Sequence, residues 1–262
     1  MLATLALSLT LQAPKPNPAA DLVSKMLAYY AGAQSMTGTI LLTASDGKGQ
    51  VQVQTTLQFE KPSKLYIKQV KTGNNPMQWL AVSDGKTFSY DSPSSAAINE
   101  KRLHEPVYQK IPTETDRNGL YVQRNYTVGE IYSVVAESSL GDRSIPLDVA
   151  IGNRNNLAHD RMTWVTVESG GKTTIDGVEA NVVKGLWREY GNQAIPTKRG
   201  ADLSNAPSFE MVITDQGKLL RYVISYTMSN KDGTMMAKLT ETWDVDLTVN
   251  GKPDENLFVD RG

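Results

Sequence analysis

Apolar and polar residues alternate along most of the chain, which is the pattern of a half-buried β-strand. Valine, leucine and phenylalanine alternate with glutamine and threonine over residues 51–59, and similar alternation runs through 220–228 and 239–247. In the last of these segments Glu241 interrupts the apolar row. Further strands are predicted over residues 36–43, 64–71, 77–83, 86–91, 162–168, 178–186 and 209–214.

Asp-Gly and Asn-Gly pairs separate several of these predicted strands. Such pairs tolerate the positive φ angles that tight hairpin turns require. The helices that parallel βαβ units need between successive strands are missing from the pattern. The sequence therefore predicts an antiparallel sheet connected largely by hairpins. The six pairs are Asp46-Gly47, Asp84-Gly85, Asn118-Gly119, Asp176-Gly177, Asp232-Gly233 and Asn250-Gly251.

One amphipathic helix is predicted before the first strand. Asn17 is a preferred N-cap residue, and Pro18 suits the first helical position. Apolar residues then recur at helical spacing, Met26 and Tyr30 among them, until Gly32 provides a stop signal. The wide apolar face of this helix needs a surface to cover.

The region 92–161 differs from the rest of the chain. Its first part is rich in proline, serine and charge and has little periodicity. Thr127 and Glu130 have capping-box spacing and predict a short helix, and residues 145–151 predict another short helix or a turn. We therefore expect a single domain over 14–262 with an insertion at about 92–161.

Residues 1–13 form an apolar segment with the length of a signal-peptide core, too short to cross a bilayer. The proline-rich stretch 14–18 that follows has the composition of a linker. A first β-strand or a hydrophobic tail are the alternatives. We expect a signal peptide or its remnant, and hence an exported protein in the periplasm or another extracytoplasmic compartment.

The composition excludes several classes of function. The 262-residue chain is 40% hydrophobic and has a formal net charge of −1, which is typical of a globular protein without a basic field for nucleic acid. It has no cysteine, which excludes disulfides and thiolate metal sites. Its two histidines, His104 and His159, match no metal-site spacing and are interpreted as surface residues. Since catalytic and nucleotide-binding motifs are also missing, we expect no enzyme, no cofactor and no metal site.

Two segments, 59–65 and 80–91, resemble the most recognisable segments of the periplasmic outer-membrane lipoprotein carrier family, the LolA-like proteins. The start of the predicted helix, 20–23, is similar to the family's opening. Residues 209–226 and 249–258 resemble its C-terminal strands.

The resemblance implies an α+β fold that is mainly antiparallel β. It implies a strongly curved, unclosed β-barrel covered by an N-terminal helix and by helical lid segments. It also implies a monomeric periplasmic carrier that binds acyl chains of a lipoprotein or lipid non-covalently and moves them towards the outer membrane. Membrane-bound donor and acceptor proteins are then the expected partners. The alternative is a periplasmic sensor or scaffold module that binds a protein partner with the same fold.

The chain departs from the family's pattern in two ways. Lys61 stands where the carriers typically have an arginine that hydrogen-bonds to the lid, and lysine lacks the planar fork of donors. The span between Pro93 and Trp164 is much longer than the family's lid segment. These differences indicate a divergent relative.

An acyl-chain carrier needs an apolar cavity and a cover that moves. The predicted cavity lining is apolar or aromatic, although period-two apolar residues are also the pattern of an ordinary core. Lys61, Met26 and Tyr30 are the predicted lid contacts, with a solvated charge at the strand end as the alternative role of Lys61. The lining candidates are Leu57, Phe59, Leu65, Ile67, Phe88, Tyr222, Ile224, Tyr226 and Trp243.

Overall fold

A computed structural model gives the fold. It describes residues 17–73, 76–85, 87–90, 107–110, 113–115, 121–123, 127–135, 145–151, 164–187, 189–190, 193–194, 207–229 and 235–259.

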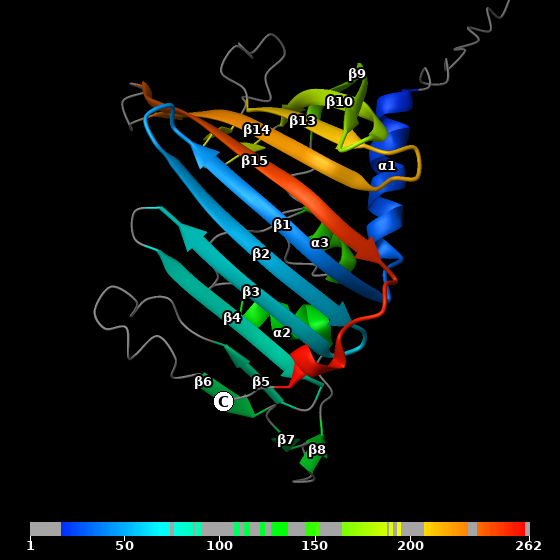
Figure 1. Cartoon of the computed structure of the whole chain (residues 1–262), viewed down its shortest axis with the longest axis vertical. Coiled ribbons are helices and arrows are strands. Elements are labelled where there is room, and N and C mark those ends of the chain that lie inside the picture. Colours follow the sequence, from blue (N-terminus) through cyan, green and yellow to red (C-terminus); the bar gives the residue numbers. More distant parts are fainter. Residues whose placement is uncertain are drawn as a thin grey trace, which may run out of the picture.

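A single antiparallel sheet dominates the molecule (Figure 1). In the described part of the chain its eleven strands lie in the order β6-β5-β4-β3-β2-β1-β15-β14-β13-β10-β9, and the two edge strands do not pair with each other, so the curved sheet stays open. This confirms the predicted fold class. The strands are β1 (Ser35–Ser45), β2 (Gln50–Glu60), β3 (Lys64–Thr72), β4 (Met77–Asp84), β5 (Thr87–Tyr90), β6 (Val107–Lys110), β9 (Trp164–Ile175), β10 (Val178–Trp187), β13 (Ser208–Ile213), β14 (Leu219–Ser229) and β15 (Met235–Val249).

Three helices lie on one face of this sheet, which we call the inner face: α1 (Pro18–Ala31), α2 (Val128–Val135) and α3 (Ile145–Ile151). Figure 1 shows α2 and α3 behind the sheet and α1 beside the ends of β13 and β14. Buried apolar side chains of the helices and of the inner face form one core cluster. None of the described helices is long and apolar enough to span a membrane.

The predicted strands are confirmed where the structure describes them, and three of the Asp-Gly pairs form the expected turns. Asp46-Gly47, Asp84-Gly85 and Asp176-Gly177 connect β1 to β2, β4 to β5 and β9 to β10. Asp176 has a φ of 48° and Gly177 a φ of 80°, which is the left-handed geometry that such turns require. Asn250-Gly251 follows β15 and leads into a 3₁₀ turn, η3 (Glu255–Phe258). The other two pairs lie outside the described residues.

The helix signals are also confirmed. The Asn17 side chain accepts hydrogen bonds from the backbone N–H groups of Ala19 and Ala20 at the start of α1. In α2 the backbone N–H of Thr127 donates to the Glu130 carboxylate at 2.8 Å, and the N–H of Glu130 donates to the Thr127 hydroxyl at 3.3 Å. This reciprocal pair is a capping box, as the spacing predicts.

The pattern did not predict β6, nor the short strands β7 (Thr113–Thr115), β8 (Tyr121–Gln123), β11 (Glu189–Tyr190) and β12 (Gln193–Ala194). These segments have two to four residues, too few to show a period. The predicted insertion thus supplies an edge strand of the main sheet. Residues 1–13 lie outside the described part of the chain, and the domain assignment stays a prediction.

The C-terminal segment covers part of the opposite, outer face. Gln58 on β2 donates to the carbonyl of Asp254 at 2.7 Å, and its side-chain oxygen accepts from the N–H of Asp254 at 3.0 Å. Lys64 forms an ion pair with Glu255 at 2.8 Å, and Phe258 is buried. These contacts hold η3 against β2 and β3.

Candidate functional site

The inner face is built from rows of paired residues that run across the strands. One row joins Leu247, Gly38, Leu57 and Ile67, and the next joins Phe59 and Leu65. Directly paired residues share a face. The predicted lining residues on β2 and β3 therefore lie together, and each is at most 1% exposed.

A second group of predicted lining residues lies on β14 and β15. The rings of Tyr222 and Trp243 are stacked, with centroids 4.1 Å apart and an interplanar angle of 6°. Tyr222 and Ile224 are buried, and Tyr226 is half-buried. The structure thus places both groups on the inner face but at different positions along the strands, and the side chain of Phe88 lies outside its described part.

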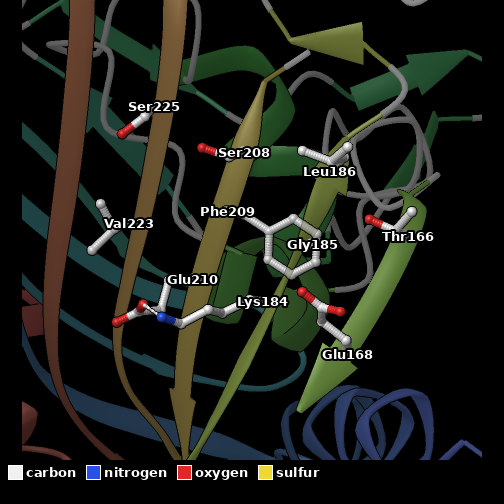
Figure 2. A pocket seen from close by; sticks show the side chains of 10 residues that line it. All are labelled: Thr166, Glu168, Lys184, Gly185, Leu186, Ser208, Phe209, Glu210, Val223 and Ser225. Carbon is white, nitrogen blue, oxygen red and sulfur yellow. Dashed lines mark ion pairs between the residues drawn. The ribbon is translucent and has the colours of Figure 1, made fainter. Parts of the chain in front are cut away.

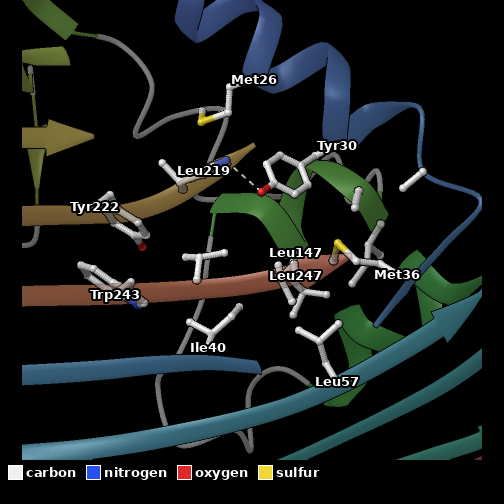
Figure 3. Packing of buried hydrophobic residues seen from close by; sticks show 14 of the residues in the cluster. Met26, Tyr30, Met36, Ile40, Leu57, Leu147, Leu219, Tyr222, Trp243 and Leu247 are labelled. Atoms are coloured by element: carbon white, nitrogen blue, oxygen red, sulfur yellow. Dashed lines mark hydrogen bonds between the residues drawn. The ribbon is translucent and has the colours of Figure 1, made fainter. Parts of the chain in front are cut away.

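Helix α1 is anchored to the sheet by several polar contacts. The backbone N–H of Leu219 donates to the Tyr30 hydroxyl at 3.1 Å (Figure 3). The Asn17 side chain donates to the carbonyl of Val167 at 3.1 Å, and the Lys25 ammonium donates to the carbonyl of Asp215. Burial raises the pKa of Tyr30 above the ordinary range of a phenol, so its hydroxyl stays neutral. These contacts hold α1 against the sheet, where it forms part of the cover.

Helices α2 and α3 form the rest of the cover. The N–H of Val128, at the start of α2, donates to the carbonyl of Pro62 at 2.6 Å. A Cβ added to Gly129 would lie 2.9 Å from the carbonyl oxygen of Ile151, so the two helices touch at this glycine. Figure 3 shows Leu147 of α3 beside Leu247 of the sheet.

Lys61 lies next to this α2 contact. Its backbone N–H donates to the carbonyl of Gln34 at 2.9 Å, and partial burial lowers the pKa of its ammonium group. The neighbouring Pro62 carbonyl, not Lys61, accepts the hydrogen bond from the Val128 N–H of the helix. A latch role for the Lys61 side chain stays a prediction.

The inner face changes along its strands. Toward the hairpin between β1 and β2, its apolar side chains are only partly covered, and Val51 is 37% exposed. We call this region the open end, formed by Ala44, Val51, Tyr226, Leu239 and Glu241. We call the region under the helices the covered end, formed by Met36, Ile40, Leu57, Phe59, Leu65, Ile67, Val245 and Leu247.

Polar side chains on the inner face are few. Gln69 donates to the Thr55 hydroxyl at 3.3 Å, and both side chains are buried. The Tyr226 hydroxyl donates to the Glu241 carboxylate at 3.0 Å at the open end. Lys71 points to the same face from the end of β3, since it pairs with Val53. In the sequence, Glu241 is visible as a break in the apolar row. Lys71 is not among the predicted site residues; its signal is that it occupies the last inward position of the alternation in β3.

Two concavities lie on the outer face. The larger, about 630 Å³, is shown in Figure 2. It contains the ion pair between Lys184 and Glu210, at 3.1 Å, and the Ser208 and Ser225 side chains. The other, about 470 Å³, includes the ion pair between Arg221 and Asp244. Both mix charged and apolar groups, unlike the covered end of the inner face, and the predicted apolar cavity stays a prediction.

Among the residues that the structure describes, no group of three or more potential ligands could hold a metal ion. His104 and His159 lie outside these residues.

No protein-family model matches the chain, and no curated protein matches it. Solved structures with a similar fold include MucB, at 13% identity and a TM-score of 0.41, over 95% of this chain and 64% of that one. LprF from Mycobacterium bovis is 14% identical with a TM-score of 0.38, over 89% and 96% of the two chains. A LolA superfamily protein from Nitrosomonas europaea is 11% identical with a TM-score of 0.27, over 92% and 97%.

A LolA-superfamily protein is thus among the structures to which this chain is similar. The chain spans 64% of the MucB chain that it matches. With TM-scores of 0.41 or less, these similarities do not bear on what the chain binds.

Proposed function

We propose that the protein is a periplasmic carrier that binds acyl chains of a lipid or lipoprotein non-covalently on the inner face and moves them towards the outer membrane. The observation that carries this proposal is the unequal cover of one continuous apolar face. Three helices bury one end of that face, whereas apolar side chains at the other end stay half-exposed.

An exposed apolar surface of this kind suits an acyl chain. Each buried CH₂ group contributes about 0.8 kcal/mol, so a chain of about 16 carbons gains on the order of 12 kcal/mol before ordering costs. A carrier must match a large part of this value to take the chain from a membrane. The ligand would enter at the open end and extend toward the covered end as α2 and α3 move.

The cover has parts that suit this movement. Helix α1 has hydrogen bonds to β14, to β9 and to the turn between β13 and β14, and α2 meets the sheet side at the bond from Val128 to Pro62. In this proposal α1 is the static part of the cover, and α2 with α3 is the lid. The apolar segment 1–13 supports export to the periplasm.

Displacement of the neutral dye Nile red by a fatty acid tests the proposal, together with mass spectrometry of lipid that co-purifies with the protein. Ala44 and Thr43 are half-buried neighbours on β1 that point to opposite faces. We expect Ala44→Trp to fill the open end and abolish displacement, and Thr43→Trp to keep it. The absence of both displacement and co-purifying lipid in the unmodified protein would overturn the proposal.

A second function, binding of a protein partner, is favoured by the outer face. Its concavities contain charged pairs and hydroxyl groups, which suit the polar rim of a protein interface. A complex that survives Ala44→Trp but is lost in Lys184→Glu would favour this sensor or scaffold role.

A further inference from the structure

Two opposite charges lie on the inner face, one within the open end and one in the row next to it. Among the described residues that point inward from β1–β4 and β13–β15, Glu241 and Lys71 are the charged ones. Glu241 lies on β15 and Lys71 on β3, with β1 and β2 between them. Three strand spacings across the sheet and two residues along the strands separate their Cα positions by about 16 Å.

The two charged groups have different surroundings. The Glu241 carboxylate accepts a hydrogen bond from the Tyr226 hydroxyl. Lys71 is half-buried at the edge of the apolar surface, and within the described part of the chain its ammonium group makes no hydrogen bond or ion pair. An ammonium group in this position can still take an anionic partner, and charge-assisted hydrogen bonds are stronger than neutral ones.

The surface between the charges is apolar. The row that contains Lys71 continues through Val53 and Leu42 to Trp243, and the row that contains Glu241 continues through Ala44 to Val51. We infer that the open end binds an anionic amphiphile, with its carboxylate or phosphate at Lys71. Its acyl chain would extend across Val53 and Leu42 toward the Tyr222–Trp243 stack, side chains that are at most 9% exposed and that the ligand reaches as the cover moves. Glu241 disfavours the reverse orientation because it would place two negative charges together. This inference rests on the proposed function and specifies the class of its ligand.

Matched ligands test the role of charge. Oleate and methyl oleate have the same acyl chain and differ in the charge of the head, and lysophosphatidylglycerol presents a phosphate in place of a carboxylate. We expect both anionic ligands to displace Nile red about tenfold more tightly than methyl oleate at low salt. The preference should decrease at 0.5 M salt, because added ions screen a partly exposed charge. Tight binding of only one anionic ligand would support the inference and identify the headgroup as carboxylate or phosphate.

Matched variants test the role of Lys71. Lys71→Gln should remove the preference and leave the affinity for methyl oleate unchanged. Lys68 lies on the same strand but points to the outer face, so Lys68→Gln should keep the preference. The thermal midpoints of both variants check that they fold.

Equal affinity for oleate and methyl oleate in the unmodified protein would overturn this inference while the proposed function stands. An equal effect of Lys68→Gln and Lys71→Gln on the preference for the anionic ligands would also overturn it. Failure of all three ligands to displace the dye would overturn the proposed function itself, and the inference with it.

Discussion

The two ends of the inner face are made by the same strands and differ in what covers them. On β15, Leu247 is fully buried beneath the helices, whereas Leu239 on the same face is half-buried. On β2, Leu57 is 1% exposed and Val51 is 37% exposed. One apolar pattern thus produces a packed core at one end and an accessible apolar surface at the other, and the helices determine which is which.

The largest effect should come from shortening the two leucines of β15. Leu247→Ala removes a fully buried side chain and leaves a cavity, so we expect it to lower the free energy of unfolding by about 2–5 kcal/mol. Leu239→Ala should cost about 1 kcal/mol because water already reaches part of this side chain. Urea unfolding measures both values. Equal destabilisation would contradict the distinction between the two ends.

The two substitutions should affect ligand binding in the opposite order. If the open end receives the acyl chain, Leu239→Ala weakens the displacement of Nile red by oleate more than Leu247→Ala does, once both variants are measured under conditions in which they are folded. A larger loss in Leu247→Ala would place the ligand under the helices.

The next effect concerns the fixed part of the cover. Tyr30→Phe removes the acceptor of the Leu219 N–H, which is buried, and a buried donor without an acceptor costs about 1–3 kcal/mol. Tyr29→Phe is the matched control, since no hydrogen bond is described for its hydroxyl. Urea unfolding of the two variants compares them. If they are equally stable, the Tyr30 contact does not anchor α1.

Weakening helix α2 should have a smaller effect on the free energy of unfolding and a larger effect on the rate of ligand release. Thr127→Ala removes one half of the capping box and should cost about 1 kcal/mol. Because α2 belongs to the proposed lid, we expect faster release of bound oleate in stopped-flow measurements. Ser24→Ala on α1 is the control, since its hydroxyl only donates to the carbonyl of Ala20 within the same helix. Unchanged release in Thr127→Ala would remove α2 from the lid.

Local features were predictable because they depend on neighbours in the chain. The alternation over 51–59 predicts β2, and the spacing of Thr127 and Glu130 predicts the start of α2. The inward orientation of Leu57 and Phe59 also follows from that alternation. Propensity, period and turn chemistry therefore account for most of the elements.

The strand order and the difference between the two ends were not predictable. Strand β1 lies between β2, its neighbour in the chain, and β15, which is some 200 residues away, and no local pattern specifies that pairing. Ala44 and Ile40 occupy equivalent, inward positions in the alternation of β1, yet Ile40 is buried and Ala44 is half-buried. Only the position of the helices accounts for this difference in burial. For the same reason, no local pattern could relate Lys71 to Glu241, because β3 and β15 are brought onto one face only by the order of the strands.

The smallest effect is expected on the outer face, at the contact between Lys64 and Glu255. This ion pair raises the pKa of Lys64, chiefly through the hydrogen bond to Glu255. A raised pKa in the folded state means that the stabilisation is fully present below the pKa of the unfolded chain, about 10.4, and is lost as the pH rises through the folded value. The difference in thermal midpoint between the unmodified protein and Lys64→Gln should therefore be small at pH 7, because the pair is exposed, and should disappear near pH 12. Lys68→Gln should show no such loss, and a Lys64 difference that is the same at both pH values would mean that its chain packs on Phe258 rather than pairing with Glu255.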